Sequence, residues 1–512
     1  MQSYEPGVTR IAPSLMRPAI YGFVGSAAIL AGASQQNSPF TQKVQGAWWF
    51  GIPAPNATPH LGGPGQWLFV GVCAVYGGML LMLRAWYDVA RLTSRTKNIP
   101  VRFLVPIFIA WCLPLLIVAP IFSHDAYSYA AQGELMSHHM NPYLYGPGVL
   151  RTGTGFGSLP DPLWWYVTSP YGPVFLVVDG WLVSLMHHNV LASVMALRGL
   201  ALFGVVLCAI GIPVLARSFH RDAATAFSLA VLNPLILLNL VGGEHNDALM
   251  LGLLVVGLAL ARRGHPIWGI LLCSVSAAIK IPGFIGVLYI GWEWRGSEAS
   301  YRERVRPLLA AVTIAGVAMT LFTQFAGVGW RWVVGLSNPD TVRSWLDPAT
   351  GVGLVFGQIA NLVGLPELGH PILTIARAGA LALSLAIALV LLLWSDRIGA
   401  LSAIGWTFIA VALLGPIVQP WYLAWGAVFL APIAEGRVRK FVYVVSALPC
   451  FLGLPGGWVF TDELRSANPF LTALFSFLLV GLAVLLIGPN GRAMLRPWAR
   501  RLQRSDESAA LA

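Results

Sequence analysis

Charged side chains are scarce in this sequence. Of its 512 residues only 10% are Asp, Glu, Lys or Arg, and just 21 are acidic, whereas a soluble domain carries about 25% charged residues. Hydrophobic residues make up 57%, and the mean hydropathy is +0.70. This composition excludes a soluble globular protein. Because many uncharged runs approach the roughly twenty residues of a membrane span, it predicts an all-α polytopic membrane protein.

Cysteine is equally sparse and shows no useful pattern. The five cysteines lie inside apolar runs without paired spacing, which excludes a disulfide framework and a thiolate metal site. The adjacent histidines His138–His139 and His187–His188 are the remaining candidates for metal ligands. Neighbouring histidines rarely converge on one ion, and no Asp, Glu or Cys joins them at ligand spacing. We therefore expect no metal and no cofactor.

The chain is basic, with a net charge of +11, but nucleic acid is not the expected partner. Lys and Arg cluster in short stretches between apolar runs, such as "ARSFHRD", "WRGSEASYRERVR", "EGRVRK" and "RAMLRPWARRLQR". Such clusters are typical of cytoplasmic loops under the positive-inside rule. No soluble basic domain, internal repeat or low-complexity linker is present, so residues 1–512 form a single integral membrane domain in a plasma (inner) membrane.

The basic clusters predict how the chain threads through the bilayer. The result is about 13–14 transmembrane helices with both termini cytoplasmic, including an uncleaved first span and a basic tail at 488–512. Outward spans are expected at about 18–33, 103–122, 223–241, 266–280, 306–325, 399–415 and 440–456. Returning spans are expected at about 66–83, 190–216, 246–261, 281–294, 371–394, 420–434 and 469–487.

Two segments allow more than one placement. Residues 169–188 are apolar enough to span, but a span there would move every later basic loop outside, so we place them at the interface as an amphipathic or re-entrant helix. Residues 266–294 lie between two Arg-rich ends and must form a hairpin with Lys280–Pro282 near its outer turn. Extracytoplasmic loops at 123–189 and 326–370 follow from this threading.

An acid stands where the apolar run "FLVPIFIAWCLPLLIVAPIF" ends, in "SHDAYSYAAQGELMSHHMNPY". Asp125, Ser128, Tyr129 and Gln132 have the spacing of one helical face, which predicts a short helix on the membrane surface that ends before "NPY". Asp125 either caps this helix or acts chemically. Amide, hydroxyl and aromatic groups nearby suit sugar binding, although an interfacial aromatic belt explains some of them.

Other polar groups are expected near the same face. "GGEHNDALM" places Glu244, His245, Asn246 and Asp247 at an outer turn, where they either cap the next span or bind substrate. Three cations interrupt apolar runs: Arg198, Lys280 and Arg377. An intramembrane cation suggests function by default, with an anionic lipid headgroup as partner, whereas snorkelling to the interface is the alternative.

Several of these motifs resemble a known family. "SHDAYSYAAQGELMSHHMNPY", "SPYGPVF", "GGEHNDALMLGLLVVGLALA", "AAIKIPG" and "QPWYLAWGAVFLAP" are similar, over roughly residues 100–435, to the polyprenol-phosphate-mannose-dependent α-1,6-mannosyltransferases of mycobacteria and corynebacteria. These belong to the GT-C glycosyltransferases. The resemblance places the essential acid at Asp125 and the Lys-x-Pro motif at Lys280. Glu244 is an addition to the plainer Gly-His-Asn-Asp pattern of the family.

The resemblance implies a GT-C-like fold and an inverting mannosyltransferase. Its donor would be polyprenyl-phosphate-mannose, its acceptor a lipid-anchored α-1,6-mannan of lipomannan and lipoarabinomannan, and membrane lipids would surround both. Asp125 would deprotonate the acceptor 6-hydroxyl, while Lys280, Arg198 and Arg377 would bind the donor phosphate. The expected substrate-binding residues are His124, Tyr127, Tyr129, Gln132, Asn141, Tyr143, Tyr171, Glu244, His245, Asn246, Asp247, Gln419, Trp421 and Tyr422.

Two alternatives remain at this point. One is a transferase that uses another polyprenyl-phosphate sugar for a cell-envelope glycan. The other is a lipid-linked glycan flippase or transporter, although transporters place charged groups at mid-membrane on broken helices rather than in outer loops.

Overall fold

The computed structural model describes residues 8–34, 40, 48–49, 52–53, 64–151, 155–336 and 347–452. The predicted span at 469–487 and the basic tail at 488–512 lie outside these residues. The described α-helices are α1 (Val8–Ala33), α2 (Pro64–Arg95), α3 (Val105–Ile117), α4 (Asp125–Ser137), α5 (Pro173–Leu185), α6 (Val190–Ser218), α7 (Ala223–Ala230), α8 (Asp247–Arg262), α9 (Pro266–Ala277), α10 (Phe284–Glu293), α11 (Tyr301–Ala326), α12 (Trp332–Gly335), α13 (Pro348–Leu362), α14 (Gly369–Leu393), α15 (Ser395–Ile398), α16 (Ala400–Leu414), α17 (Tyr422–Leu430) and α18 (Gly436–Ala447).

Shorter elements connect these helices. The 3₁₀ segments are η1 (Val101–Phe103), η2 (Pro147–Leu150), η3 (Pro162–Trp164), η5 (Ile281–Gly283), η7 (Pro366–Leu368), η8 (Ala431–Ile433) and η9 (Pro449–Phe451), and η4 (Ile236–Gly242) is a π-helix. Two short antiparallel strands, β1 (Trp48–Trp49) and β2 (Ile52–Pro53), are the strands of the described residues.

The helices confirm an all-α polytopic membrane protein. Four of the described helices are long and apolar enough to cross a bilayer: Pro13–Ala33, Val190–Ser218, Tyr301–Ala326 and Pro366–Leu393. A fifth span is formed if η4 and α8, which meet at 115°, count as one broken helix. Five other predicted spans coincide with apolar helices of 10–17 residues. The total of 13–14 spans stays a prediction.

One predicted span, 223–241, is broken rather than continuous. Helix α7 ends at Ala230, and Pro234 prevents residue 233 from continuing it. At this break, the Asn233 side chain donates hydrogen bonds to the Leu229 carbonyl and to Ser446 Oγ. The chain then resumes as the π-helix η4, which delivers the "GGEHND" turn to the interior of the bundle.

Small residues bring α6 and α8 into close contact beneath that turn. A Cβ added at Gly204 would lie 2.3 Å from the Ala248 carbonyl oxygen, and one added at Gly252 would lie 2.3 Å from the Gly204 carbonyl oxygen. Backbones approach this closely in membrane helix pairs only where side chains are small. The contact therefore fixes the start of α8, and with it Asp247, against α6.

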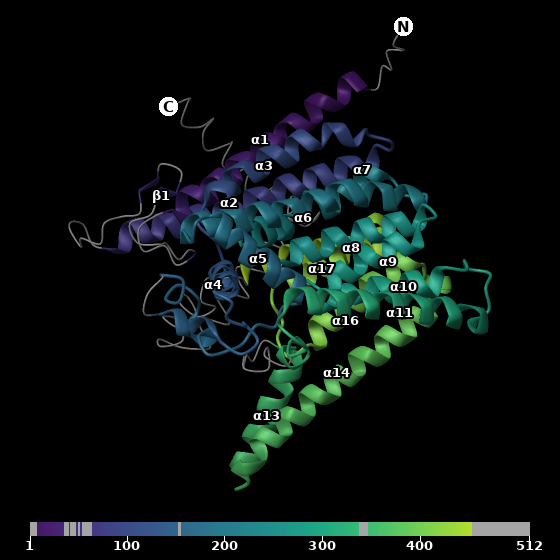
Figure 1. Cartoon of the computed structure of the whole chain (residues 1–512). Coiled ribbons are helices and arrows are strands. Elements are labelled where there is room, and N and C mark those ends of the chain that lie inside the picture. Colours follow the sequence, from purple (N-terminus) through teal and green to yellow (C-terminus); the bar gives the residue numbers. More distant parts are fainter. Residues whose placement is uncertain are drawn as a thin grey trace.

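Helix α4 is enclosed by other segments of the protein, so its polar stripe is not a solvated face, whereas its position at the membrane surface stays a prediction. Its residues from Ala126 to Leu135 are all buried, and the helix packs against α5 and α6 (Figure 1). Two of its buried polar side chains bond to distant segments: Gln132 Oε1 accepts from Ser169 Oγ at 2.8 Å, and Glu134 Oε2 lies 2.7 Å from His188 Nδ1. Sequence periodicity does not reveal such partners, and for this reason the polar stripe resembles a solvated face.

The predicted loop 326–370 is largely helical where the structure describes it. Helix α13 occupies much of it and packs against α14, and the two project together from the remaining helices (Figure 1). The interfacial segment predicted at 169–188 contains α5 and packs on α4. Four of the five cysteines are buried, Cys73 lies on the surface of α2, and none is in a disulfide.

Candidate active site

Asp125 is the first residue of α4 and remains partly accessible. His124 occupies the N-cap position and Asp125 the first helical position, so Asp125 is not the N-cap residue of α4. Its side chain is 22% exposed, and its carboxylate makes long contacts with the Tyr129 hydroxyl at 3.5 Å and with His245 Nε2 at 3.7 Å. Asp125 is therefore an acid with unused hydrogen-bonding capacity at the end of an apolar run.

His245 faces Asp125 from the turn between η4 and α8. Its Nδ1 lies 2.6 Å from the carbonyl oxygen of Asn239, which can only accept, so Nδ1 carries the proton. The neutral ring then presents the lone pair of Nε2 toward Asp125. The ring also stacks on Trp421, with centroids 3.6 Å apart. His245 is thus fixed in tautomer and in plane.

Asp247 and Lys280 form a buried ion pair beside this acid. Lys280 Nζ donates to both carboxylate oxygens of Asp247 at 2.9 Å, and Trp425 Nε1 donates to Oδ1 at 2.6 Å. Asp247 is fully buried, and both of its carboxylate oxygens accept hydrogen bonds. Lys280, in the turn between α9 and η5, also lies within side-chain hydrogen-bonding reach of Tyr422.

Aromatic rings surround the ammonium group of Lys280. It lies 4.6 Å from the ring centroid of Tyr422, 5.4 Å from that of Trp425 and 6.0 Å from that of Tyr171. The backbone positions Tyr171 here, because the amide of the next residue, Gly172, donates to the Ile279 carbonyl. This close approach requires glycine, since a Cβ at position 172 would lie 2.2 Å from the Ala278 carbonyl oxygen. Tyr129 packs edge-on against Tyr171 and links this aromatic wall back to Asp125.

Arg198 and Glu244 form a second buried ion pair rather than a substrate-binding group. The guanidinium of Arg198 donates to Glu244 Oε1 and to the carbonyls of Leu116 and Val118, and both side chains are at most 1% exposed. Tyr127 is buried within electrostatic reach of both. The predicted phosphate ligand Arg198 is therefore occupied in joining α6, α3 and the "GGEHND" turn.

Three further predicted binding residues support the loop. Gln132 accepts from Ser169, Asn141 Nδ2 donates to the Val328 carbonyl at 2.8 Å, and the Tyr143 hydroxyl donates to the Tyr171 carbonyl at 2.6 Å. These bonds tie α4 and the 141–171 segment together. The roles of the three residues in substrate binding stay a prediction.

His124 lies next to Asp125 and 4.0 Å from Asp161. Burial lowers the pKa of His124, and the carboxylates of Asp161 and Asp125 oppose the shift.

Asn246 is buried, and neither its Oδ1 nor its Nδ2 has a hydrogen-bond partner among the described residues. Gln419 is partly buried and precedes Trp421 by one proline. Asn246 thus offers the pattern expected of a group that a ligand satisfies.

Arg377 belongs to a separate network on α14. Its Nε donates to Thr350 Oγ1 at 3.0 Å, and Thr350 Oγ1 donates to the Pro416 carbonyl at 2.9 Å. Burial raises the pKa of Asp347 to about 6, although the hydrogen bond from the Val418 amide and the charge of the Arg377 guanidinium lower it. Arg377 therefore anchors the turn that precedes Gln419 and Trp421. The structure does not bring it into contact with Lys280.

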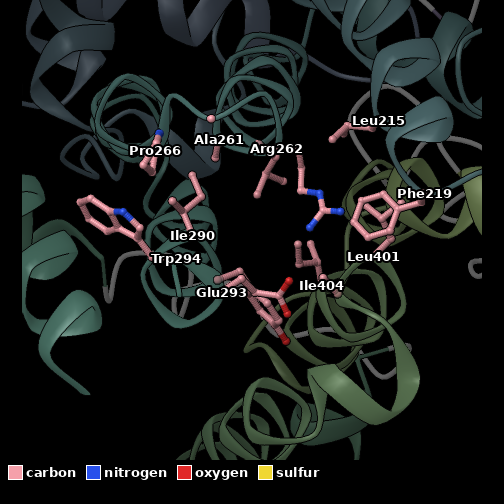
Figure 2. A pocket seen from close by; sticks show the side chains of 14 residues that line it. Leu215, Phe219, Ala261, Arg262, Pro266, Ile290, Glu293, Trp294, Leu401 and Ile404 are labelled. Atoms are coloured by element: carbon pink, nitrogen blue, oxygen red, sulfur yellow. The ribbon is translucent and has the colours of Figure 1, made fainter. Parts of the chain in front are cut away.

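A cavity of about 370 Å³ lies at the other end of these helices (Figure 2). Arg262, which ends α8, and Glu293, which ends α10, reach into it, and Phe219 and Leu401 line it. Helix α8 separates it from Asp247 by 15 residues, or about 22 Å. The cavity contains none of the predicted site residues and is not the candidate active site.

Sequence reasoning missed two residues of the site. Trp425 donates to Asp247, and its position four residues after Trp421 on a helical segment was the signal that could have found it. Asn239 contributes only its backbone carbonyl, which fixes the tautomer of His245, and no residue type predicts such a role.

The fold and site define a helical membrane protein with an accessible carboxylate, a buried Lys–Asp pair and an aromatic wall at one end of its helices. Comparison with known proteins names the class. The profile of "α-(1→6)-mannopyranosyltransferase, N-terminal domain" matches residues 19–296, and that of "MptB C-terminal domain" matches residues 349–494. The chain therefore belongs to the α-(1→6)-mannopyranosyltransferase family of glycosyltransferases.

Curated relatives are similar over most of the chain. α-(1→6)-Mannopyranosyltransferase A of Mycobacterium tuberculosis is 31% identical, over 82% of this chain and 81% of its own length. α-(1→6)-Mannopyranosyltransferase B of Corynebacterium glutamicum is 30% identical, over 77% of this chain and 71% of its own length. No solved structure matches. The resemblance drawn from the sequence motifs is confirmed at the level of the family.

Proposed function

We propose that this chain transfers mannose from polyprenyl-phosphate-mannose to the 6-hydroxyl of a lipid-anchored α-1,6-mannan, at the extracytoplasmic face of the plasma membrane. The names of its relatives support mannosyl transfer and the α-1,6 linkage. One observation carries the role of the site. Asp125 is accessible and weakly hydrogen bonded, whereas the neighbouring acid Asp247 is buried and accepts hydrogen bonds at both carboxylate oxygens.

Asp125 is the general base in this proposal. Its carboxylate takes the proton of the acceptor 6-hydroxyl as the hydroxyl oxygen attacks the anomeric carbon of the donor. The bond from that carbon to the phosphate oxygen breaks, and polyprenyl phosphate leaves with the electron pair. A β-linked donor and an α-linked product require inversion in a single displacement. Because the leaving group is already an anion, one carboxylate suffices where inverting glycosidases use two.

Lys280 would stabilise the leaving phosphate through its positive charge, while its bonds to Asp247 and its contact with Tyr422 keep the ammonium in place. A charged donor aimed at a developing anion is effective in a site that excludes bulk water. Tyr171, Tyr422 and Trp421 offer ring faces and edges for the sugar. Arg198 and Arg377 are assigned positioning roles rather than direct phosphate binding, because both are engaged elsewhere.

The test is a transfer assay with the purified full chain in detergent. Polyprenyl-phosphate-[¹⁴C]mannose and a synthetic α-1,6-mannobioside with a short lipid tail are supplied, and the product linkage is read by NMR and α-mannosidase digestion. We expect an α-1,6-linked product that is absent with Asp125→Asn. Transfer only from polyprenyl phosphate carrying another sugar would overturn the donor assignment, and any other product linkage would overturn the acceptor assignment.

A further inference from the structure

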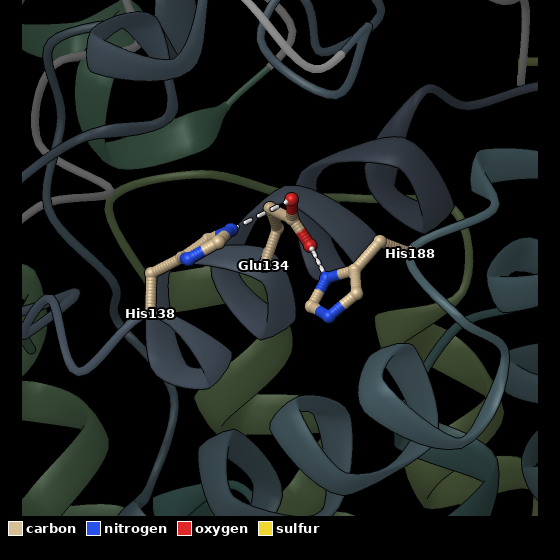
Figure 3. A group of neighbouring side chains, drawn as sticks. All are labelled: Glu134, His138 and His188. Atoms are coloured by element: carbon tan, nitrogen blue, oxygen red, sulfur yellow. Dashed lines mark hydrogen bonds and ion pairs between the residues drawn. The ribbon is translucent and has the colours of Figure 1, made fainter.

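The two histidine pairs converge on one buried acid at the far end of α4. Glu134 lies in the last turns of α4, His138 is the C-cap of the same helix, and His188 lies in the turn between α5 and α6 (Figure 3). His138 Nε2 is 3.2 Å from Glu134 Oε1, and His188 Nδ1 is 2.7 Å from Glu134 Oε2. The two histidines of an adjacent pair do not share one partner. Instead, one histidine from each pair, His138 and His188, contacts Glu134.

The geometry of these three side chains is that of a ligand set. Their three candidate ligand atoms all lie within 4.8 Å of one another. The two imidazole rings stack with centroids 5.4 Å apart and flank the carboxylate, and each points one nitrogen at a different Glu134 oxygen (Figure 3). The Glu134 side chain is 2% exposed, whereas those of His138 and His188 are 51% and 45% exposed. A buried carboxylate under two solvent-facing imidazoles leaves the outer positions open to water.

The donor chemistry selects the class of ion. Two imidazoles and one carboxylate are the protein ligands of tetrahedral Zn²⁺ sites that keep one position for water. Imidazole suits Zn²⁺ and neighbouring transition metals, whereas Mg²⁺ and Ca²⁺ prefer oxygen ligands. An ion would take the place of the hydrogen bonds between the ring nitrogens and the carboxylate oxygens, and each neutral imidazole would carry its single proton on the nitrogen that does not bind the ion.

The backbone at these positions is also unusual. His139, His187 and His188 have φ between 51° and 58°, and they account for three of the seven non-glycine residues with positive φ in the part of the chain that the structure describes. Helix ends commonly place glycine at such a position because side chains are strained there. Of the three proposed ligands, His188 has this conformation, with φ of 56°, whereas His138 has φ of −90°. His139 and His187 share the strain but are not ligands, so the backbone conformation does not by itself distinguish the ligand positions.

We propose that Glu134, His138 and His188 bind one Zn²⁺ ion, which joins the end of α4 to the turn between α5 and α6. The site is separate from the candidate active site, because α4 runs from residue 125 to residue 134 over about 13 Å. The ion holds the helix that carries Asp125 and takes no part in sugar transfer. This proposal does not depend on the proposed function.

The test uses the full chain, purified without a histidine tag and stripped with a chelator. Zn²⁺ is titrated against a competing chromophoric chelator, and the melting temperature is measured with and without Zn²⁺. We expect one equivalent bound per chain, a higher melting temperature with Zn²⁺, and no such shift with Mg²⁺ or Ca²⁺. His138→Gln, His188→Gln and Glu134→Gln should each weaken Zn²⁺ binding about tenfold or more, the usual effect of disturbing a metal site.

The chain supplies its own matched controls in the neighbouring histidines. His139→Gln and His187→Gln change the same residue type one position away and should bind Zn²⁺ as the wild type does. Absence of stoichiometric binding would overturn the proposal, as would equal losses in all four histidine variants. Variants of His138 and His188 that melt lower by the same amount with and without Zn²⁺ would show a hydrogen-bonded cluster without a metal role.

Discussion

His245 Nε2 faces Asp125 Oδ2 at a distance of 3.7 Å. Both atoms are acceptors, because the Asn239 carbonyl holds the only proton of the neutral ring on Nδ1. Two acceptors that face each other without a proton between them create a place for a donor, and a sugar hydroxyl is such a donor. The relationship therefore favours binding of an acceptor hydroxyl between Asp125 and His245.

Replacing Asp125 with Asn tests the base directly. The fold should be preserved, because Asp125 is not the N-cap residue of α4 and its contacts with Tyr129 and His245 are long. The transfer rate should fall by about 10²–10⁴-fold, the usual contribution of a general base. Initial rates at saturating donor, together with the melting temperature, measure both effects. An active Asp125→Asn protein would remove Asp125 from the chemistry.

His245→Gln should lower kcat/KM by less than the loss of the base itself, by about tenfold to 10²-fold. The reason is that His245 orients the hydroxyl whose proton Asp125 takes. Adding His245→Gln to Asp125→Asn should then cost little more, because residues that share one hydrogen-bonded group are coupled. Kinetics of the two single variants and the double variant give this coupling. Losses that simply multiply would mean that the two residues act independently.

The sequence predicted the helices well but the surroundings of polar residues poorly. Long apolar runs bounded by basic clusters locate helices such as α6, α11 and α14, because length and charge decide insertion. Which polar groups pair is decided by contacts between segments far apart, such as Glu134 with His188 or Arg198 with Glu244. Neither pair has a signature in local spacing. The candidate active-site acid was predictable because its motif is local.

Removal of Lys280 alone should first damage the fold. Lys280→Ala leaves the buried carboxylate of Asp247 unpaired, and breaking a buried ion pair this way costs about 3–5 kcal/mol. Lys280→Met combined with Asp247→Asn should restore stability, since the amide oxygen introduced at position 247 still accepts from Trp425. This double variant should still show a raised KM for the donor. A normal donor KM in the stable double variant would exclude phosphate binding by Lys280.

The Arg198–Glu244 pair should behave differently from the Lys280 pair. Arg198→Met alone should destabilise by about 3–5 kcal/mol, because Glu244 remains buried without a counter-charge. Arg198→Met with Glu244→Leu should recover most of that stability and keep normal donor kinetics. Melting temperatures and donor-concentration series on these variants and the wild type check this. A stable double variant with a raised donor KM would return Arg198 to the phosphate site.

The direction of insertion is tested by cysteine labelling in intact cells. The native Cys73 is replaced by Ser first, because it is the exposed cysteine among the five. Ser158→Cys reports on the loop after Asp125, and Arg302→Cys reports on the start of α11. Both positions are exposed. The neighbouring Arg304 is not used, because it is buried in an ion pair with Asp396. A membrane-impermeant maleimide should label the thiol introduced at position 158 in intact cells. It should label the thiol at position 302 only after permeabilisation, since the basic cluster around α11 is expected to be cytoplasmic. The reverse pattern would place Asp125 on the cytoplasmic face and would require a donor whose sugar is presented there.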